Sequence, residues 1–359
     1  MIWLLLTLCA LIGISPAPVR SQAAVSESER LRAGIDSFVS RRVAEDAFSG
    51  TVLVARGGEI IFRHGFGKAN EETGIAMTPD TRLTIASMTK LLTQVAIRQL
   101  EQAQRLSLSD TVGKFLPEYP NPVVRSKVTI DQLLRHRSGI GNFWNERYAA
   151  RRTEVRSVSD YLELFQDDSL LFEPGTRQQY SNGGYVVLGA IIERVSGQPY
   201  HDYLRDHVFR PAGMTQTTPY DGRVSLPNAA VGYTRMTDGG RRAPGPRRPN
   251  TDSKPGLSGP AGDHYSSVDD LHRLATALTK HQLLDSTHTA ALLGPRYAEG
   301  AGFRSAGGGP GVNAELSLYP SGFVVVVLSN YDPPSATEVA QYIGSLITSA
   351  PLANARDRR

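Results

Sequence analysis

Two predicted β-hairpins lie near opposite ends of this chain, and they constrain its fold more than any other feature. Residues 49–67, SGTVLVARGGEIIFRHGFG, alternate apolar and polar side chains around Gly57 and Gly58, as the strands of a hairpin do. Residues 311–332, GVNAELSLYPSGFVVVVLSNYD, give a second hairpin pattern that turns at 320–322. Helical patterns at 27–44 and 335–347 flank the hairpins. The sequence therefore predicts an α/β (α+β) fold whose antiparallel sheet is closed by both chain ends.

The middle of the chain reads differently, because helical patterns replace the strand patterns. The predicted helices cover 87–104, 129–135, 158–166, 183–196, 200–207 and 267–279, and the Gly-, Pro- and Arg-rich stretch 236–262 is predicted to be a long surface loop. We therefore expect a sheet domain built from 24–86 and 300–350, an inserted and mostly helical domain at 87–299, and a disordered tail at 351–359. A cleft where the two domains meet is the expected site.

Composition narrows the possible partners. Hydrophobic residues make up 40% of the 359 residues and charged residues 21%, which is ordinary for a globular protein. Part of the net charge of +4 lies in RRAPGPRR at 241–248 and RDRR at the C-terminus. Neither stretch has interleaved aromatic residues or belongs to a recognisable module, so no nucleic-acid partner is expected.

The first 23 residues resemble a signal peptide. An apolar run from Ile2 to Ile14 is too short to span a bilayer comfortably, and the triplet at 21–23 resembles a cleavage site that would make Ala24 the mature start. An uncleaved membrane anchor is the alternative. The single cysteine, Cys9, lies inside this segment, so the mature chain has neither a disulfide nor a thiol nucleophile. We expect a periplasmic or secreted protein with no further membrane span.

Residues 85–90, IASMTK, contain the one Ser-x-x-Lys pattern of the chain, Ser87 and Lys90. On a helix these positions lie on one face, so the amine can reach the hydroxyl. Lysine is scarce here, since arginine supplies most of the positive charge, and a desolvated lysine can act as a base whereas arginine cannot. The alternative is an N-cap serine followed by a solvated lysine.

Other catalytic patterns are absent from the sequence. There is no GxSxG elbow and no HExxH, and the histidines lack metal-ligand spacing, so neither a metal nor another cofactor is expected. A second polar group for a serine–lysine pair could come from Tyr180-Ser181-Asn182, which opens a predicted helix. A phenol that simply packs under this helix is the alternative for Tyr180. Tyr119-Pro120-Asn121 has the same pattern but sits in a proline-bracketed turn.

Together these residues resemble the serine β-lactamases and penicillin-binding proteins, and specifically the class C β-lactamase-related branch, which also holds DD-peptidases, D-aminopeptidases and esterases. SMTK at 87–90, YSN at 180–182, and the stretches VTIDQLLRHRSGIG, EPGTRQQYSNGGYVVLGAIIERVSGQPYHDYLRDHVFRPAGM and SSVDDLHRLATAL match that branch in wording and order. The resemblance runs from about residue 47 to residue 342 and implies a β-lactamase/transpeptidase-like fold.

The resemblance also implies roles for the matching residues. Ser87 would be the acylated nucleophile, Lys90 its base, and Tyr180 the proton shuttle, while Asn182 would orient the substrate and fix Lys90. The oxyanion hole would use the backbone N–H of Ser87 and that of Gly308. His136 would belong to a structural turn near the cleft, and His264 is a candidate for lining the pocket, whose shape depends on loops such as 141–157 and 236–262.

The third family motif departs from its pattern. In FRSAGGGPGVNA, Ser305-Ala306-Gly307 stands where the family has Lys-Thr-Gly or His-x-Gly, and a shifted alignment would offer Arg304 as the cation. Without the family's cation, tight recognition of β-lactam or peptide carboxylates is not expected. The resemblance therefore implies an exported serine hydrolase of small-molecule or peptide substrates that cleaves esters or amides, with esterase- or peptidase-like activity favoured over a true β-lactamase. The alternative is a non-catalytic module that recognises cell-wall peptides or a protein partner.

Overall fold

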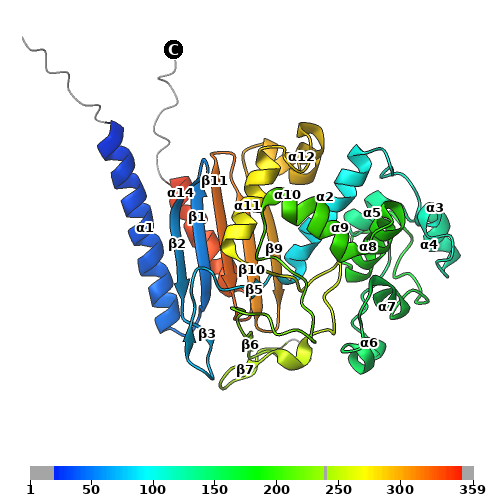
Figure 1. Cartoon of the computed structure of the whole chain (residues 1–359), viewed down its shortest axis with the longest axis horizontal. Helices are drawn as coiled ribbons and strands as arrows, with labels where there is room; N and C mark the ends of the chain where they lie inside the picture. The colour runs from blue at the N-terminus through cyan, green and yellow to red at the C-terminus, as the bar shows by residue number, and fades with distance from the viewer. Residues whose placement is uncertain (1–19, 238–240, 350–359) are drawn as a thin grey trace, which may run out of the picture.

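A five-stranded antiparallel sheet forms the centre of the computed structural model, which describes residues 20–237 and 241–349. Its strand order is β2-β1-β11-β10-β9 (Figure 1). The bounds are β1 Gly50–Arg56, β2 Glu59–Phe66, β9 Phe303–Gly309, β10 Val312–Leu318 and β11 Phe323–Ser329. Strand β1 pairs with β11 from Gly50↔Ser329 to Arg56↔Phe323, so the two ends of the chain share one sheet, as predicted.

Both faces of the sheet are buried. Along β11, Val325 and Val327 face a core that they share with Val339 and Ile343 of α14 (Ser335–Ser349). Val326 faces the opposite core, because successive strand side chains point to opposite faces. That second core contains α11 (Val268–Thr279), which packs against β11 and β1 and lies in front of the sheet in Figure 1.

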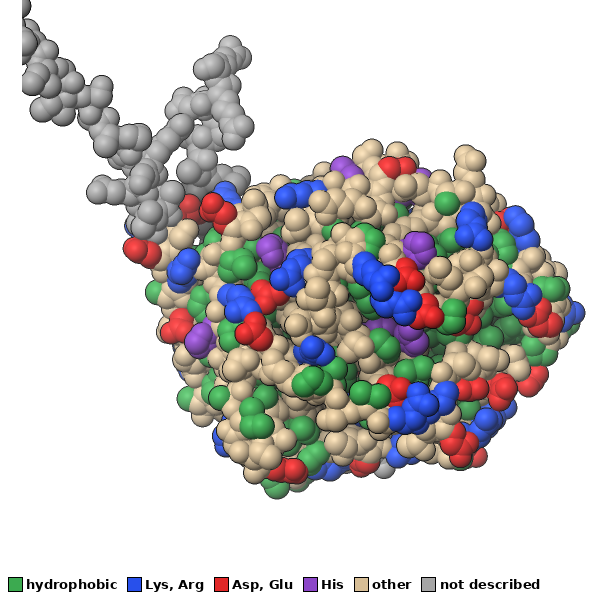
Figure 2. Space-filling model, viewed as in Figure 1, with side chains coloured by type: hydrophobic (Ala, Val, Ile, Leu, Met, Phe, Trp, Pro, Cys, Tyr) green, Lys and Arg blue, Asp and Glu red, His purple; other side chains and the backbone are tan. Residues whose placement is uncertain are grey.

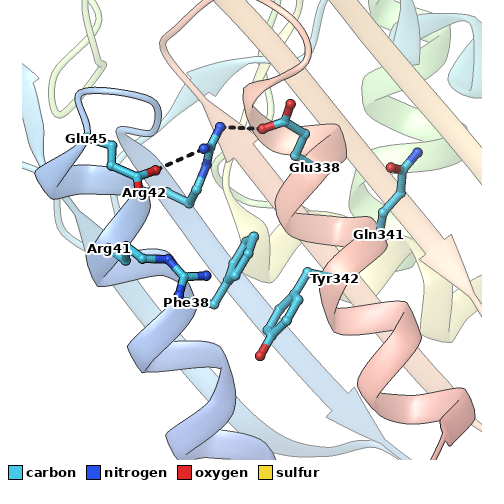
Figure 3. Close-up of a pocket in the computed structure, with 7 residues that line it drawn as sticks. All are labelled: Phe38, Arg41, Arg42, Glu45, Glu338, Gln341 and Tyr342. Atoms are coloured by element: carbon cyan, nitrogen blue, oxygen red, sulfur yellow. Dashed lines mark hydrogen bonds and ion pairs between the residues drawn. The ribbon is translucent and has the colours of Figure 1, made fainter.

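The two terminal helices contact each other. Helix α1 (Arg20–Ala44) lies against β2 and α14. The rings of Phe38 and Tyr342 stack with centroids 3.8 Å apart, and Arg42 of α1 forms ion pairs with Glu45 and with Glu338 of α14 (Figure 3). These contacts hold the first and last described helices side by side.

Short helices dominate the middle of the chain, on the right of Figure 1. The longest is α8 (Asn182–Ser196), buried from Asn182 to Ile192, capped at its start by Ser181 and ended by Gly197 in the left-handed region at φ 74°. The other elements are α2 Thr89–Gln102, α3 Val112–Phe115, α4 Pro122–Lys127, α5 Ile130–Leu134, α6 Glu146–Arg151, α7 Val158–Glu163, α9 Tyr200–Leu204, α10 Arg210–Ala212, α12 Ser286–Leu293, α13 Pro295–Ala298, β3 Lys68–Asn70, β4 Ile75–Ala76, β5 Leu83–Thr84, β6 Tyr233–Thr234, β7 Arg248–Pro249 and β8 Tyr265–Ser266.

Two sequence predictions need correction. The stretch 236–262 is not only a surface loop, since it contains β7 and the buried Asn250, whose Nδ2 donates to Pro310 O at 2.8 Å. The predicted helix 200–207 is α-helical only as far as Leu204 and continues as a π-helical turn over Arg205–Phe209.

Three predictions concern the chain ends and the division into domains. The signal peptide at 1–23 falls mostly outside the described residues, as does the tail at 351–359. The division into a sheet domain and an inserted helical domain stays a prediction. No helix in the described ranges combines the length and apolar character needed to cross a bilayer. Basic and acidic side chains are interspersed over the face seen in Figure 2.

Candidate active site

Ser87 lies in a tight turn between β5 and α2. It belongs to a 3₁₀ turn, Ala86–Met88, that leads directly into α2. Ala86 has a φ of 42°, in the left-handed region that disfavours non-glycine residues. Backbone hydrogen bonds hold this turn, with Ile85 N donating to His264 O at 2.8 Å and Asp263 N donating to Ala86 O at 3.3 Å. The surrounding structure therefore fixes a strained backbone at the position of the predicted nucleophile.

Lys90 is buried beneath Ser87, with 5% of its surface exposed. Its Nζ donates to Ser87 Oγ at 3.3 Å, to Asn182 Oδ1 at 2.7 Å, and to the carbonyl of Ala261. Burial lowers the pKa of Lys90 to about 7, against the field of Asp263, which raises it. A substantial fraction of Lys90 is therefore neutral at physiological pH and able to accept a proton from Ser87.

Tyr180 approaches Ser87 from the other side. Its hydroxyl donates to Ser87 Oγ at 2.7 Å, and its ring centroid lies 4.9 Å from Lys90 Nζ. Burial raises the pKa of Tyr180, although the hydrogen bond to Ser87 lowers it. The phenol therefore stays protonated at neutral pH and faces the serine as a proton donor.

The start of helix α8 positions Tyr180 and Asn182. The Ser181 backbone N–H donates to His136 Nδ1 at 3.2 Å, and the His136 ring packs 4.7 Å from that of Tyr180. Asn182 is 3% exposed, and its backbone N–H donates to Asn142 Oδ1 at 2.9 Å. The Asn182 side chain thus accepts a hydrogen bond from Lys90, while His136 contacts the tyrosine segment.

The glycines of β9 meet the nucleophile turn. A Cβ added at Gly307 would lie 2.1 Å from Ile85 O and 3.0 Å from Ser87 N, so only glycine allows this close approach. Gly308 lines the cavity that contains Ser87. Because β9 is an edge strand, one of its sides has no strand partner. Ser87 and Gly308 therefore both border the cavity, where the family resemblance predicts that their N–H groups bind an oxyanion.

The third motif supplies no cation to the cavity. Ser305 pairs with Leu316 of β10 and shares its sheet face with Gly307, and it does not line the cavity. Arg304 points to the other face, where its guanidinium forms two hydrogen bonds with the buried Glu315 at 2.9 and 2.6 Å. The structure therefore brings together Ser87, Lys90, Tyr180, Asn182, Gly307 and Gly308. Ser305 lies farther along β9, outside the cavity.

Substituting Gly307 with alanine should reduce kcat/KM by about 100-fold, because the added methyl group must push β9 away from Ser87 by about an ångström. Gly309→Ala is the matched control, since a Cβ there meets only Val312 Cγ1 at 3.6 Å. Steady-state kinetics on an activated ester would measure both variants. A Gly307→Ala protein within twofold of wild type would contradict the close approach.

The cavity above Ser87 has a volume of about 930 Å³. Its walls combine aromatic side chains with charged ones, and both predicted pocket loops contribute, with Phe143, Trp144 and Tyr148 from 141–157 and Asn250, Asp252 and Lys254 from 236–262. His264 does not line it. That ring is fully buried against His201, with centroids 5.2 Å apart, and its neighbour Asp263 faces the cavity instead.

Sequence reasoning missed three contributors to the site, namely the Ala261 carbonyl, Asn142 and Asp263. Backbone carbonyls and loop amides carry no sequence signal of their own. In the described ranges no three His, Cys, Asp or Glu side chains gather closely enough to hold a metal ion.

The sheet, its flanking helices and the Ser-x-x-Lys turn define a β-lactamase/transpeptidase-like protein. A family model described as Beta-lactamase matches residues 35–346. The chain belongs to this family, whose members are generally serine hydrolases.

Known relatives agree with this assignment. PbpX of Bacillus subtilis (strain 168), a relative that carries a penicillin-binding-protein name, is 32% identical over 299 residues, which cover 81% of this chain and 72% of that protein. The crystal structure of a penicillin-binding protein from Bacillus halodurans is 30% identical with a TM-score of 0.73, over 86% of this chain and 99% of that one. A D-amino acid amidase from Ochrobactrum anthropi SV3, at 22% identity and a TM-score of 0.73 over 89% of this chain and 99% of its own, shares the fold.

Proposed function

We propose that this protein is an exported serine hydrolase, periplasmic or secreted, that cleaves esters or amides through an acyl-serine intermediate. The single observation that carries the proposal is the position of Ser87 Oγ between two proton-handling groups, Lys90 Nζ at 3.3 Å and Tyr180 OH at 2.7 Å. The signal-peptide pattern at 1–23 supports export.

The geometry supports a stepwise mechanism. Neutral Lys90 accepts the Ser87 proton as Oγ attacks the substrate carbonyl, and the oxyanion that forms is bound by the N–H groups of Ser87 and Gly308. Tyr180 donates its proton to the leaving oxygen or nitrogen as the scissile bond breaks, and Lys90 returns a proton to the phenolate. Water then attacks the carbonyl carbon of the acyl-serine, and the Lys90–Tyr180 pair accepts the water proton. The bond to Ser87 Oγ breaks, the proton passes to Oγ, and the acid is released.

The charges around the site favour esters and neutral amides over β-lactams. Ser305 stands at the place of the family's cation, and the Arg304 guanidinium is bound to Glu315 on the opposite sheet face. A substrate carboxylate therefore lacks the partner that the family motif provides.

The pH dependence of kcat/KM should follow the protonation of Lys90. Because its pKa is lowered to about 7, activity should rise as pH increases and reach half of its plateau near pH 7. The pKa values of His136 and His201 are lowered to about 4 by burial, so these groups do not titrate near that midpoint. A pH profile on a neutral ester checks this expectation, with Lys254→Met as a control that keeps the midpoint. A profile that is flat between pH 6 and 8 would contradict it.

A non-catalytic module that recognises cell-wall peptides or a protein partner is the second candidate, and Ser305 in place of the cation favours it. A fluorophosphonate probe and a fluorescent penicillin separate the two, the latter because relatives of this chain are named penicillin-binding proteins. A covalent adduct on the Ser87 peptide, located by mass spectrometry, supports the hydrolase. Absence of any adduct with both probes supports the binding module.

A further inference from the structure

Asp263 is a carboxylate at the edge of the reaction centre that accepts no hydrogen bond from the described residues. It lines the cavity that contains Ser87, and its backbone N–H donates to the carbonyl of Ala86, the residue before Ser87, at 3.3 Å. Across residues 20–237 and 241–349, no hydrogen bond or ion pair is formed with the Asp263 carboxyl group. Lys90 Nζ donates to Ser87, Asn182 and Ala261 instead, and Asp263 acts on it through its electrostatic field alone. The residue also has a φ of 74°, a left-handed conformation that glycine adopts more easily.

The mechanism itself does not need this carboxylate. Its field raises the pKa of Lys90 and so opposes the neutral amine that the serine requires. The residue therefore combines an unfavourable backbone conformation with an electrostatic effect that works against the base. Strained residues of this kind concentrate at sites that hold ligands.

The other charged side chains of the cavity each contact another group of the protein. Arg248 and Asp252 form an ion pair, and Lys254 Nζ lies 5.5 Å from the Tyr265 ring centroid. Arg152 donates to Ala149 O at 3.0 Å. Asp263 is thus the acidic side chain of the lining that is left to meet a charge on the substrate, beside an aromatic wall that includes Phe143, Tyr148 and Tyr161.

We propose that Asp263 is a specificity-determining residue that binds an ammonium group of the substrate, so that preferred substrates are esters or amides with a free amino group near the scissile carbonyl and an apolar body. This inference rests on the proposed hydrolase function. A bound ammonium also cancels the field of Asp263 at Lys90. Binding of the correct substrate therefore favours the neutral base that attacks it.

Paired substrates test the proposal. The p-nitroanilides of D- and L-phenylalanine are compared with their N-acetyl derivatives at pH 7, where an α-amino group of pKa about 8 is mostly charged. For wild type we expect kcat/KM to favour the free amine by about tenfold or more for at least one enantiomer. Asp263→Asn should bring this ratio to about one. Asp263→Gly should do the same, and it relieves the left-handed backbone, so it also guards against misfolding.

The ratio of kcat/KM between the free amine and the acetylated substrate does not depend on the effect of Asp263 on Lys90, because that effect is the same for both substrates. Asp252→Asn makes the same chemical change in the same cavity and should keep the wild-type ratio. As a second readout, phenylalanine amide should slow fluorophosphonate labelling of Ser87 at lower concentration than N-acetyl-phenylalanine amide does.

Two results would overturn the inference. The first is a wild-type enzyme that does not distinguish the free amine from the acetylated substrate in turnover or in protection. The second is an Asp263→Asn variant that shifts the pH profile equally for both substrates and keeps their ratio, which would mean that Asp263 acts only through Lys90. In both cases labelling of Ser87 persists, whereas failure of the hydrolase proposal removes the labelling itself.

Discussion

Replacing Ser87 with alanine is expected to lower kcat/KM by about 10⁴-fold or more on every ester and amide that the wild type cleaves. The serine oxygen is the atom that Lys90 and Tyr180 both contact, at 3.3 and 2.7 Å, so without it neither group has a reaction to assist. Residual turnover would come from the oxyanion donors and binding alone. Steady-state kinetics and intact-protein mass after fluorophosphonate treatment measure the two effects.

The control for Ser87→Ala is Ser253→Ala. Ser253 lines the same cavity, but its Oγ donates to Asn250 O at 2.7 Å and does not contact Lys90. This variant should keep the covalent label. A Ser87→Ala protein that retains turnover within tenfold of wild type would assign the reaction to another group.

Replacing Lys90 with methionine is expected to lower kcat/KM by about 10³-fold, the range of a lost general base. The buried site accepts an apolar chain of similar length, so the fold should survive, and an unchanged thermal unfolding midpoint would verify this. Lys90 donates to Ser87, Asn182 and Ala261, so the substitution removes both the base and a fixed point of the site.

Lys90→Arg distinguishes a base from a mere positive charge. Arginine keeps the charge but stays protonated at every accessible pH, so it should not restore activity. The rise of kcat/KM with a midpoint near pH 7 should also disappear in this variant. An arginine variant within tenfold of wild type would mean that Lys90 acts as a charge and not as a base.

The arrangement of the site could be predicted where short motifs coincide with local structure. Ser87 and Lys90 are three residues apart, so a turn leading into a helix brings them together. Tyr180 and Asn182 come more than 90 residues later, and spacing alone cannot place them beside Ser87. Only their resemblance to a known family linked the two segments before the structure joined them through Lys90 Nζ and Asn182 Oδ1 at 2.7 Å.

Strand β9 could not be predicted from its residues. Glycine disfavours strands, and three glycines in a row at 307–309 suggest a loop. Pairing with β10 and the close approach to Ile85 and Ser87 outweigh this preference, and both are tertiary effects. The same limit applies to residues 263 and 264, because the φ of 74° at Asp263, not the residue types, decides which side chain faces the cavity.

The pairing of β1 with β11 also has a consequence for how the chain folds. Thr51 lies opposite Leu328, so this strand pair joins segments that are far apart in the sequence. The edge of β1 that faces β11 stays unpaired until this distant segment reaches it. Contacts of such high sequence separation slow folding and prolong exposure of an unpaired edge. The sheet is therefore completed only when β11 is present, and truncation before Phe323 leaves the first hairpin without this neighbour.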